Sequence, residues 1–252
     1  MPRCEPTCAI GDDGDMERPA DVRALLFDVF GTVVDWRGSL IAEITRVADG
    51  IGVDLPASEL ADDWRVRYSP SMDRVLAGDD PYANLDALHR SSLLQLLDER
   101  DLQLPDEAIG RLVLAWHRLE PWPDSVPGLT RLKSRYVLAT MSNGNVALLV
   151  DMAKHGGLPW DVILTPELMQ TYKKNLDSYR YVISLLGLRP EQTMMVAAHP
   201  GELRMVAGIG MRTAYVPRPT EFGDHDRRVV DIDVPVDVVC SDLENLADLL
   251  GT

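Results

Sequence analysis

Short, almost continuous apolar runs alternate along this chain with longer segments whose apolar residues recur three and four positions apart. Continuous apolar runs are typical of strands buried on both faces, and the longer spacing is typical of amphipathic helices. The predicted strands lie within 22–30, 135–144, 161–167, 192–201, 212–219 and 236–242. The predicted helices between them lie within 145–156, 176–187, 202–210 and 243–251. Strand alternating with helix predicts an α/β fold, with a Rossmann-like parallel sheet core and helices on both faces.

The long stretch between the first and second predicted strands has helical spacing throughout and no predicted strand. Its amphipathic segments lie within 39–52, 57–78, 83–101 and 105–119. We therefore expect a helical cap domain, residues 39–122, inserted after the first strand of a core domain formed by 22–38 and 123–252. Ligands of open parallel sheets bind at the carboxyl ends of the strands, so the inserted helices would cover that edge.

The first 21 residues are rich in Pro, Gly and Asp and predict a disordered leader, because they lack the apolar core of a signal peptide. Cys4, Cys8 and Cys240 form neither a disulfide framework nor a zinc-like cluster, which favours a reducing cytoplasm. The formal net charge of the 252 residues is −15, which opposes binding to nucleic acid or to a membrane surface. We expect a cytoplasmic protein with a small-molecule ligand, and a homodimer is left open.

Polar side chains follow four of the predicted strands at the point where each strand ends. They are Asp28 with Thr32, Ser142 with Asn143, Lys173, and His199 with Glu202. A single aspartate at a strand end is usually only a turn residue. Four successive crossovers that deliver polar groups to one edge predict an active site built around the carboxylate of Asp28.

The residue types at this edge suggest covalent catalysis. The Asp28 carboxylate can attack an electrophilic centre if nearby donors hold it ionised and oriented. The Lys173 ammonium suits that task, together with the hydroxyls of Thr32 and Ser142, while Asn143 can hydrogen-bond to a substrate or leaving group. A covalent intermediate then needs a water molecule.

Two residues are candidates for orienting or deprotonating that water, His199 and Glu202. Both follow the fourth predicted strand, and the sequence does not choose between them.

The motifs "FDVFGT", "MSNG" and "YKK", followed by an acidic loop after the fourth strand, resemble those of the haloacid dehalogenase superfamily. The resemblance extends from about Val22 to the C-terminus and implies the helical-cap class of this fold. Phosphatases of the superfamily have a second aspartate two residues after the nucleophile, and this chain has Phe30 there. The chain is therefore similar to the L-2-haloacid dehalogenase branch, in which the leaving halide needs no proton.

The resemblance also implies roles for residues that spacing alone does not identify. The segment "DDWRVRYSPSMDRV" looks like the dehalogenase cap helix, whose arginine receives the substrate or the departing halide, and this arginine would be Arg65. "YKKNLDSY" keeps the family lysine, Lys173, and the tyrosine six residues later, Tyr179. Phe30 would line the substrate site. Members of this branch need no metal and no other cofactor.

The chain departs from the family pattern at three places. Lys174 stands where the family usually has proline, and Phe30 replaces the tyrosine of some members. At the fourth motif, where the family has a serine, an asparagine and an aspartate, this chain offers Ala197, Ala198, His199 and Glu202.

The expected reaction is hydrolysis of short 2-haloalkanoic acids, such as haloacetates and L-2-halopropionate, to 2-hydroxy acids and halide through an aspartyl ester. Two alternatives stay open. One is a magnesium-dependent phosphatase or phosphonate-type hydrolase of the same fold. The other is a catalytically silent relative that binds a small anion or a protein.

Overall fold

The computed structural model of the chain describes residues 21–223 and 235–252. Residues 1–20 and 224–234 lie outside the described part, and they include all but the last residue of the predicted leader as well as Cys4 and Cys8. Cys240 is buried and forms no disulfide with another described residue.

Within the described residues, five parallel strands form the central sheet in the order β4-β1-β5-β6-β7. They are β1 (Ala24–Phe27), β4 (Val137–Thr140), β5 (Thr193–Ala197), β6 (Arg212–Tyr215) and β7 (Val238–Val239). Phe27 pairs with Thr140 on one side and with Val196 on the other. The chain segments that follow β1, β4 and β5 therefore emerge side by side at the carboxyl edge, and the predicted α/β core is confirmed.

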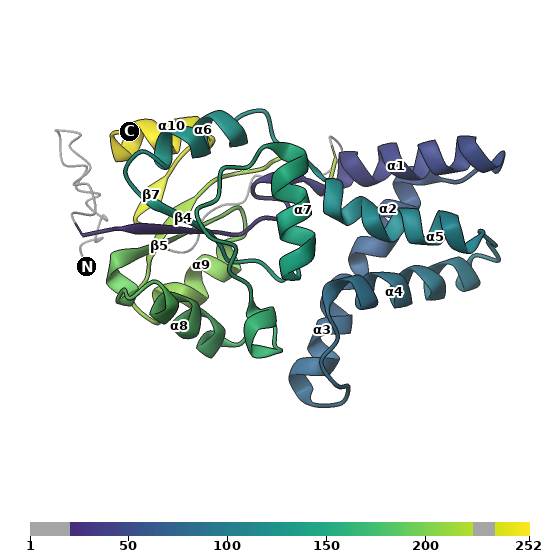
Figure 1. The fold of residues 1–252 in the computed structure, drawn as a ribbon, viewed down its shortest axis with the longest axis horizontal. Coiled ribbons are helices and arrows are strands. Elements are labelled where there is room, and N and C mark those ends of the chain that lie inside the picture. Colours follow the sequence, from purple (N-terminus) through teal and green to yellow (C-terminus); the bar gives the residue numbers. More distant parts are fainter. Residues whose placement is uncertain (1–20, 224–234) are drawn as a thin grey trace, which may run out of the picture.

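Helices cover both faces of this sheet (Figure 1). One face packs against α6 (Ser125–Leu132), α7 (Val146–Gly156) and α10 (Leu243–Leu250), and the other packs against α8 (Leu176–Leu185) and α9 (Pro200–Ala207). Successive β1 side chains belong to two separate apolar clusters, Leu25 and Phe27 to one and Leu26 to the other. Burial on both faces explains why β1 is apolar without interruption.

The segment 161–167, predicted as a strand, is not one; only an isolated bridge joins Val162 to Ala139 of β4. Backbone hydrogen bonds join Asp161 and Val162 to β4, and side-chain hydrogen bonds extend the contact. The Leu138 N–H donates to the carboxylate of Asp161, and the Thr140 hydroxyl bonds to both backbone groups of Leu164. A short 3-10 helix, η2 (Pro166–Met169), follows directly. The segment still runs beside β4, so the loop after it reaches the same edge of the sheet.

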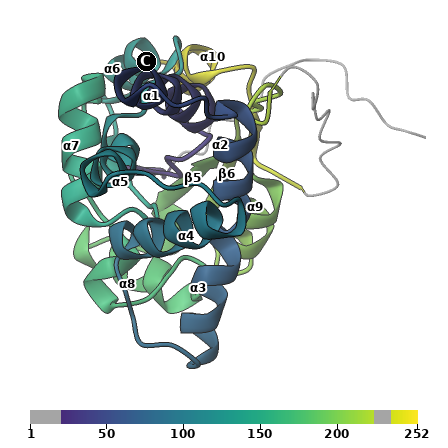
Figure 2. The ribbon, with the colours of Figure 1, turned by 90° about the vertical axis from the view of Figure 1, so that its right-hand side faces the viewer.

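The inserted segment is helical and lies to one side of the sheet, at its carboxyl edge (Figures 1 and 2). Its elements are α1 (Trp36–Ile51), α2 (Ala57–Val66), α3 (Tyr68–Ala77), α4 (Leu85–Glu99), α5 (Asp106–Val113) and the 3-10 helix η1 (Leu114–Arg118). No helix in 21–223 or 235–252 combines the length and the hydropathy that crossing a bilayer requires.

A two-residue strand pair joins the insertion to the core. β2 (Val34–Asp35) pairs antiparallel with β3 (Glu120–Pro121), so the two connecting segments lie together. Strands this short leave no alternating pattern in the sequence, and β3 therefore falls within the region where no strand was predicted. Asp35 also caps α1 by accepting the Gly38 N–H at 2.8 Å.

The contact between α6 and α10 allows a test of the packing. A Cβ on Gly128 in α6 would lie 2.5 Å from the backbone carbon of Leu243 in α10. We expect Gly128→Ala to lower the free energy of unfolding by about 1–3 kcal/mol, since the two helices must separate. Gly110→Ala in α5 is the matched control, because nothing lies within 4 Å of its Cβ, and it should stabilise the protein by about 0.5–1 kcal/mol. Urea denaturation measures both, and equal effects would contradict this packing.

Candidate active site

The Asp28 carboxylate lies directly after β1, at the centre of the carboxyl edge. Its backbone N–H donates to the Val196 carbonyl at 3.0 Å, which extends the pairing with β5 by one residue. The chain then turns at Gly31, whose φ of +84° favours glycine. The Asp28 side chain is only 8% exposed. A carboxylate this deeply buried requires close donors to stay ionised.

Three side chains supply those donors. The Thr32 hydroxyl donates to Oδ2 of Asp28 at 2.7 Å, and the Lys173 ammonium donates to Oδ1 at 2.7 Å. Nδ1 of His199 lies 2.9 Å from Oδ2. Burial raises the pKa of Asp28, but the charges and hydrogen bonds of Lys173 and His199 outweigh it and hold this pKa well below its usual range. The buried carboxylate is therefore ionised.

Lys173 is shared between two carboxylates. Its ammonium nitrogen lies 2.6 Å from Oε1 of Glu202, in addition to its bond to Asp28. The Tyr179 hydroxyl donates to the same Oε1 at 2.6 Å. Burial lowers the pKa of Lys173, yet the Asp28 and Glu202 charges raise it above the ordinary value. Burial raises the pKa of Glu202 despite the opposing effect of Lys173.

His199 bridges Asp28 to Glu221, a carboxylate that sequence reasoning missed. Nε2 of His199 lies 3.1 Å from Oε2 of Glu221, and the Trp36 indole N–H donates to Oε1 at 3.1 Å. A Cβ at Gly31 would lie 2.2 Å from Oε1, so only glycine leaves room for Glu221 in this position. Burial lowers the pKa of His199, but its bonds to the two carboxylates raise the pKa to about 10. His199 is therefore an imidazolium at neutral pH.

The helical insertion contributes the opposite wall of a cavity of about 810 Å³. Arg65 of α2 lines it, and its guanidinium carbon lies 4.2 Å from the Tyr68 ring centroid and 5.3 Å from that of Trp36. Nη1 of Arg65 is buried without a hydrogen-bond partner in the described residues. A buried guanidinium donor that lacks a partner suits an anionic ligand.

Of the three remaining predicted site residues, two line the cavity and one does not. Asn143 lines the cavity, and its side-chain oxygen accepts the Lys173 backbone N–H at 2.8 Å. Phe30 also lines it, edge-on to Tyr68. Ser142 is fully buried, and its hydroxyl has no hydrogen-bond partner in the described residues, so it makes no bond to Asp28.

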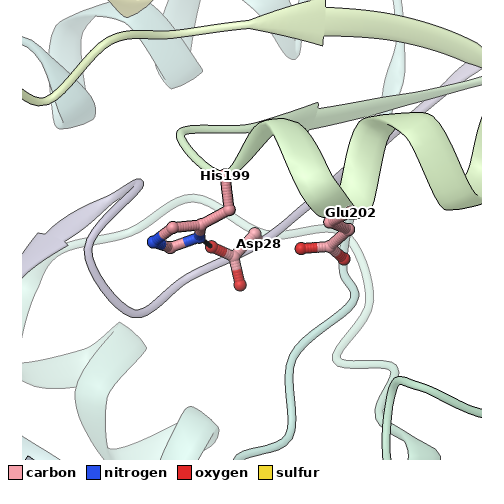
Figure 3. Close-up of side chains that lie close together, drawn as sticks. All are labelled: Asp28, His199 and Glu202. Carbon is pink, nitrogen blue, oxygen red and sulfur yellow. Dashed lines mark hydrogen bonds and ion pairs between the residues drawn. The ribbon is translucent and has the colours of Figure 1, made fainter. Parts of the chain in front are cut away.

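Asp28, His199 and Glu202 each offer a ligand atom within 4.8 Å of the others, as a metal site would require (Figure 3). The residues do not fit that role. The Lys173 ammonium already lies between Asp28 and Glu202, within hydrogen-bond distance of both. Metal-binding histidine must be neutral, whereas His199 has a pKa of about 10. A divalent ion would have to displace one cation and deprotonate another.

A family model and solved structures both relate this chain to haloacid dehalogenases. The family model of haloacid dehalogenase-like hydrolases matches residues 22–209. Among solved structures, an L-2-haloacid dehalogenase is 43% identical, with a TM-score of 0.89 over 91% of this chain and 99% of that one. A defluorinating L-2-haloacid dehalogenase is 40% identical, with a TM-score of 0.89 over 93% and 98%.

A curated relative is also a haloacid dehalogenase. The (S)-2-haloacid dehalogenase 1 of Pseudomonas sp. strain CBS-3 is 28% identical over 80% of this chain and 88% of that protein.

We expect Glu221→Gln to lower the pKa of His199 from about 10 towards neutrality, because the imidazolium loses one of its two carboxylate partners. The stabilisation that this protonation contributes is complete below the unfolded pKa of about 6.5 and is lost as the pH rises through the folded value. In Glu221→Gln the contribution is smaller and its loss is complete at lower pH, because only the folded pKa has changed. Histidine side-chain NMR, with His199→Gln for assignment, measures the titration.

Glu120→Gln is the matched control, because the Glu120 carboxylate lies 2.8 Å from the exposed His155 and is not among the described partners of His199, which are Asp28 and Glu221. It should leave the His199 titration unchanged. Identical His199 titrations in wild type and Glu221→Gln would contradict the proposed bridge.

Proposed function

Because the chain belongs to the haloacid dehalogenase-like hydrolase family, we propose that it hydrolyses the carbon–halogen bond of short L-2-haloalkanoic acids to 2-hydroxy acids and halide. The observation that supports this most directly is the Asp28 carboxylate, buried, ionised and facing the cavity. It has the form of a nucleophile that three donors orient. The named L-2-haloacid dehalogenases among its relatives support the same reaction.

In the first step, an Asp28 oxygen attacks the carbon that bears the halogen. The new carbon–oxygen bond forms as the carbon–halogen bond breaks, and the halide leaves with the bonding electron pair. Arg65 faces this space from the cap, with a donor that has no partner in the described residues, and Asn143 lines the same cavity from the core. We assign these two residues to the anionic carboxylate of the substrate and the departing halide. Phe30 lines the cavity and offers no proton, which a halide does not need.

In the second step, water attacks the carbonyl carbon of the Asp28 ester. His199 is already protonated in the resting site and cannot accept a proton from that water. Glu202 is a carboxylate beside Lys173, and burial raises its pKa, so it is the better base. We therefore assign water activation to Glu202.

The His199 imidazolium suits the complementary task. It can donate its Nδ1 proton to the alkoxide oxygen as the 2-hydroxy acid departs, because Nδ1 lies 2.9 Å from an Asp28 oxygen. The regenerated Asp28 carboxylic acid then returns a proton to His199, and Glu202 releases the water proton to solvent. The cycle consumes one water and yields the hydroxy acid, the halide and one proton. Lys173 holds the two carboxylates together throughout.

We expect halide release from chloroacetate, fluoroacetate or L-2-chloropropionate to continue in EDTA and to fall at least about a thousandfold in Asp28→Asn, which lacks the nucleophile. Ion chromatography of the released halide measures it. Asp98→Asn, an exposed position on α4, is the matched control and should keep the wild-type rate. Turnover of phosphate esters that requires magnesium, with no halide release, would instead establish the phosphatase. Inactivity in both assays would favour a binding protein.

We expect Glu202→Gln to release about one halide per enzyme and then stop, because the ester forms but its hydrolysis lacks a base. Rapid-quench halide assay and mass spectrometry of the peptide that contains Asp28 measure the burst and the adduct. Continued turnover at the wild-type rate, without adduct, would show that Glu202 is not the base.

A further inference from the structure

The cavity above Asp28 exceeds the needs of a haloacetate. Its volume is about 810 Å³, which lies within the range of about 300–1,000 Å³ typical of pockets for much larger ligands. A haloacetate or halopropionate has only a handful of non-hydrogen atoms. The residues assigned to the reaction line only one part of the cavity wall. Most of the cavity volume is therefore available to the rest of a larger ligand.

The remaining wall is largely apolar and comes from both parts of the molecule. Val66, Met72 and Leu76 contribute from the end of α2 and from α3, and Met205 contributes from α9. Met72 is buried, whereas Val66 is 71% exposed, so the wall runs from the interior to solvent. In Figure 2, α3 lies below α2, on the side of the molecule where α9 lies.

The charged residues on this part of the wall are already paired. The Lys174 ammonium lies 2.5 Å from Asp73 of α3, which links the core loop to the cap, and Asp62 receives two bonds from Arg37. By contrast, Nη1 of Arg65 has no partner in the described residues. An anionic head group is therefore favoured near Arg65, and an apolar group is favoured along the wall beyond it.

We propose that this apolar wall binds an alkyl substituent on the reacting carbon, so that the preferred substrates are 2-haloalkanoic acids of about six to eight carbons. The inference rests on the proposed function and extends it to a substrate class. With the substrate carboxylate near Arg65 and the reacting carbon over Asp28, the alkyl chain enters the space between α3 and α9. Each methylene that leaves water adds binding energy there.

The test is a series of (S)-2-bromo acids from propionate to octanoate, assayed as bromide release. We expect kcat/KM to rise about threefold for each methylene as far as hexanoate. Leu76→Trp narrows the wall and should lower the octanoate to propionate ratio of kcat/KM at least about tenfold. Leu185→Trp is the matched control, because Leu185 is 50% exposed on α8 and does not line the cavity. It should keep the wild-type ratio.

Binding provides a readout that does not depend on turnover. Isothermal titration calorimetry of the wild-type protein should show octanoate binding at least about tenfold more tightly than propionate, and Leu76→Trp should remove that difference. Bromide release that stays flat or falls with chain length, together with equal binding of the two acids, would overturn the alkyl site. Absence of bromide release from every acid, with tighter octanoate binding, would retain the alkyl site and reject the proposed reaction.

Discussion

The position of the Lys173 ammonium between the Asp28 and Glu202 carboxylates determines most of what this site can do. Two buried carboxylates would repel each other and could not both stay ionised without a shared cation. The ammonium lies within 2.7 Å of both. The rest of the structure holds that nitrogen in place: the Lys173 backbone N–H donates to Asn143, and Asn175, two residues later, caps α8. The nucleophile and the base are therefore positioned by one loop.

The cap depends on a second arrangement of charges, which surrounds the buried side chain of His117. His117 of η1 lies between Asp151 of α7, at 2.9 Å, and Asp86 of α4, at 3.0 Å, and Asn145 also donates to Asp86. Burial lowers the pKa of His117, but the two carboxylates raise it above the ordinary value. This bridge joins helices of the insertion to a core helix. It thereby holds α4, which packs against α2, the helix that carries Arg65.

Apolar runs predicted the strands of the sheet because burial on both faces leaves an uninterrupted signal in the sequence. The segment 161–167 has the same signal, but its backbone pairs with β4 only at Asp161 and Val162. Side-chain bonds of Asp161 and Thr140, which periodicity does not report, complete the contact. The polar residues after the strands could be predicted from the sequence because parallel strands end at the same edge of the sheet, which brings those residues together. Glu221 was missed although it stands two residues after the predicted strand 212–219, because no motif singles it out and its position depends on Gly31 and His199.

The fourth motif differs from the family pattern, and the difference changes the balance of charges in the site. His199 adds a cation that Glu221 accompanies, so the site contains three carboxylates, Asp28, Glu202 and Glu221, against the cations Lys173 and His199. Arg65 brings a third positive charge and has no carboxylate partner in the described residues. The site is therefore neutral as a whole, with its excess positive charge on the cap side. An anionic acid can enter that side of an otherwise acidic protein while Asp28 keeps its charge for attack.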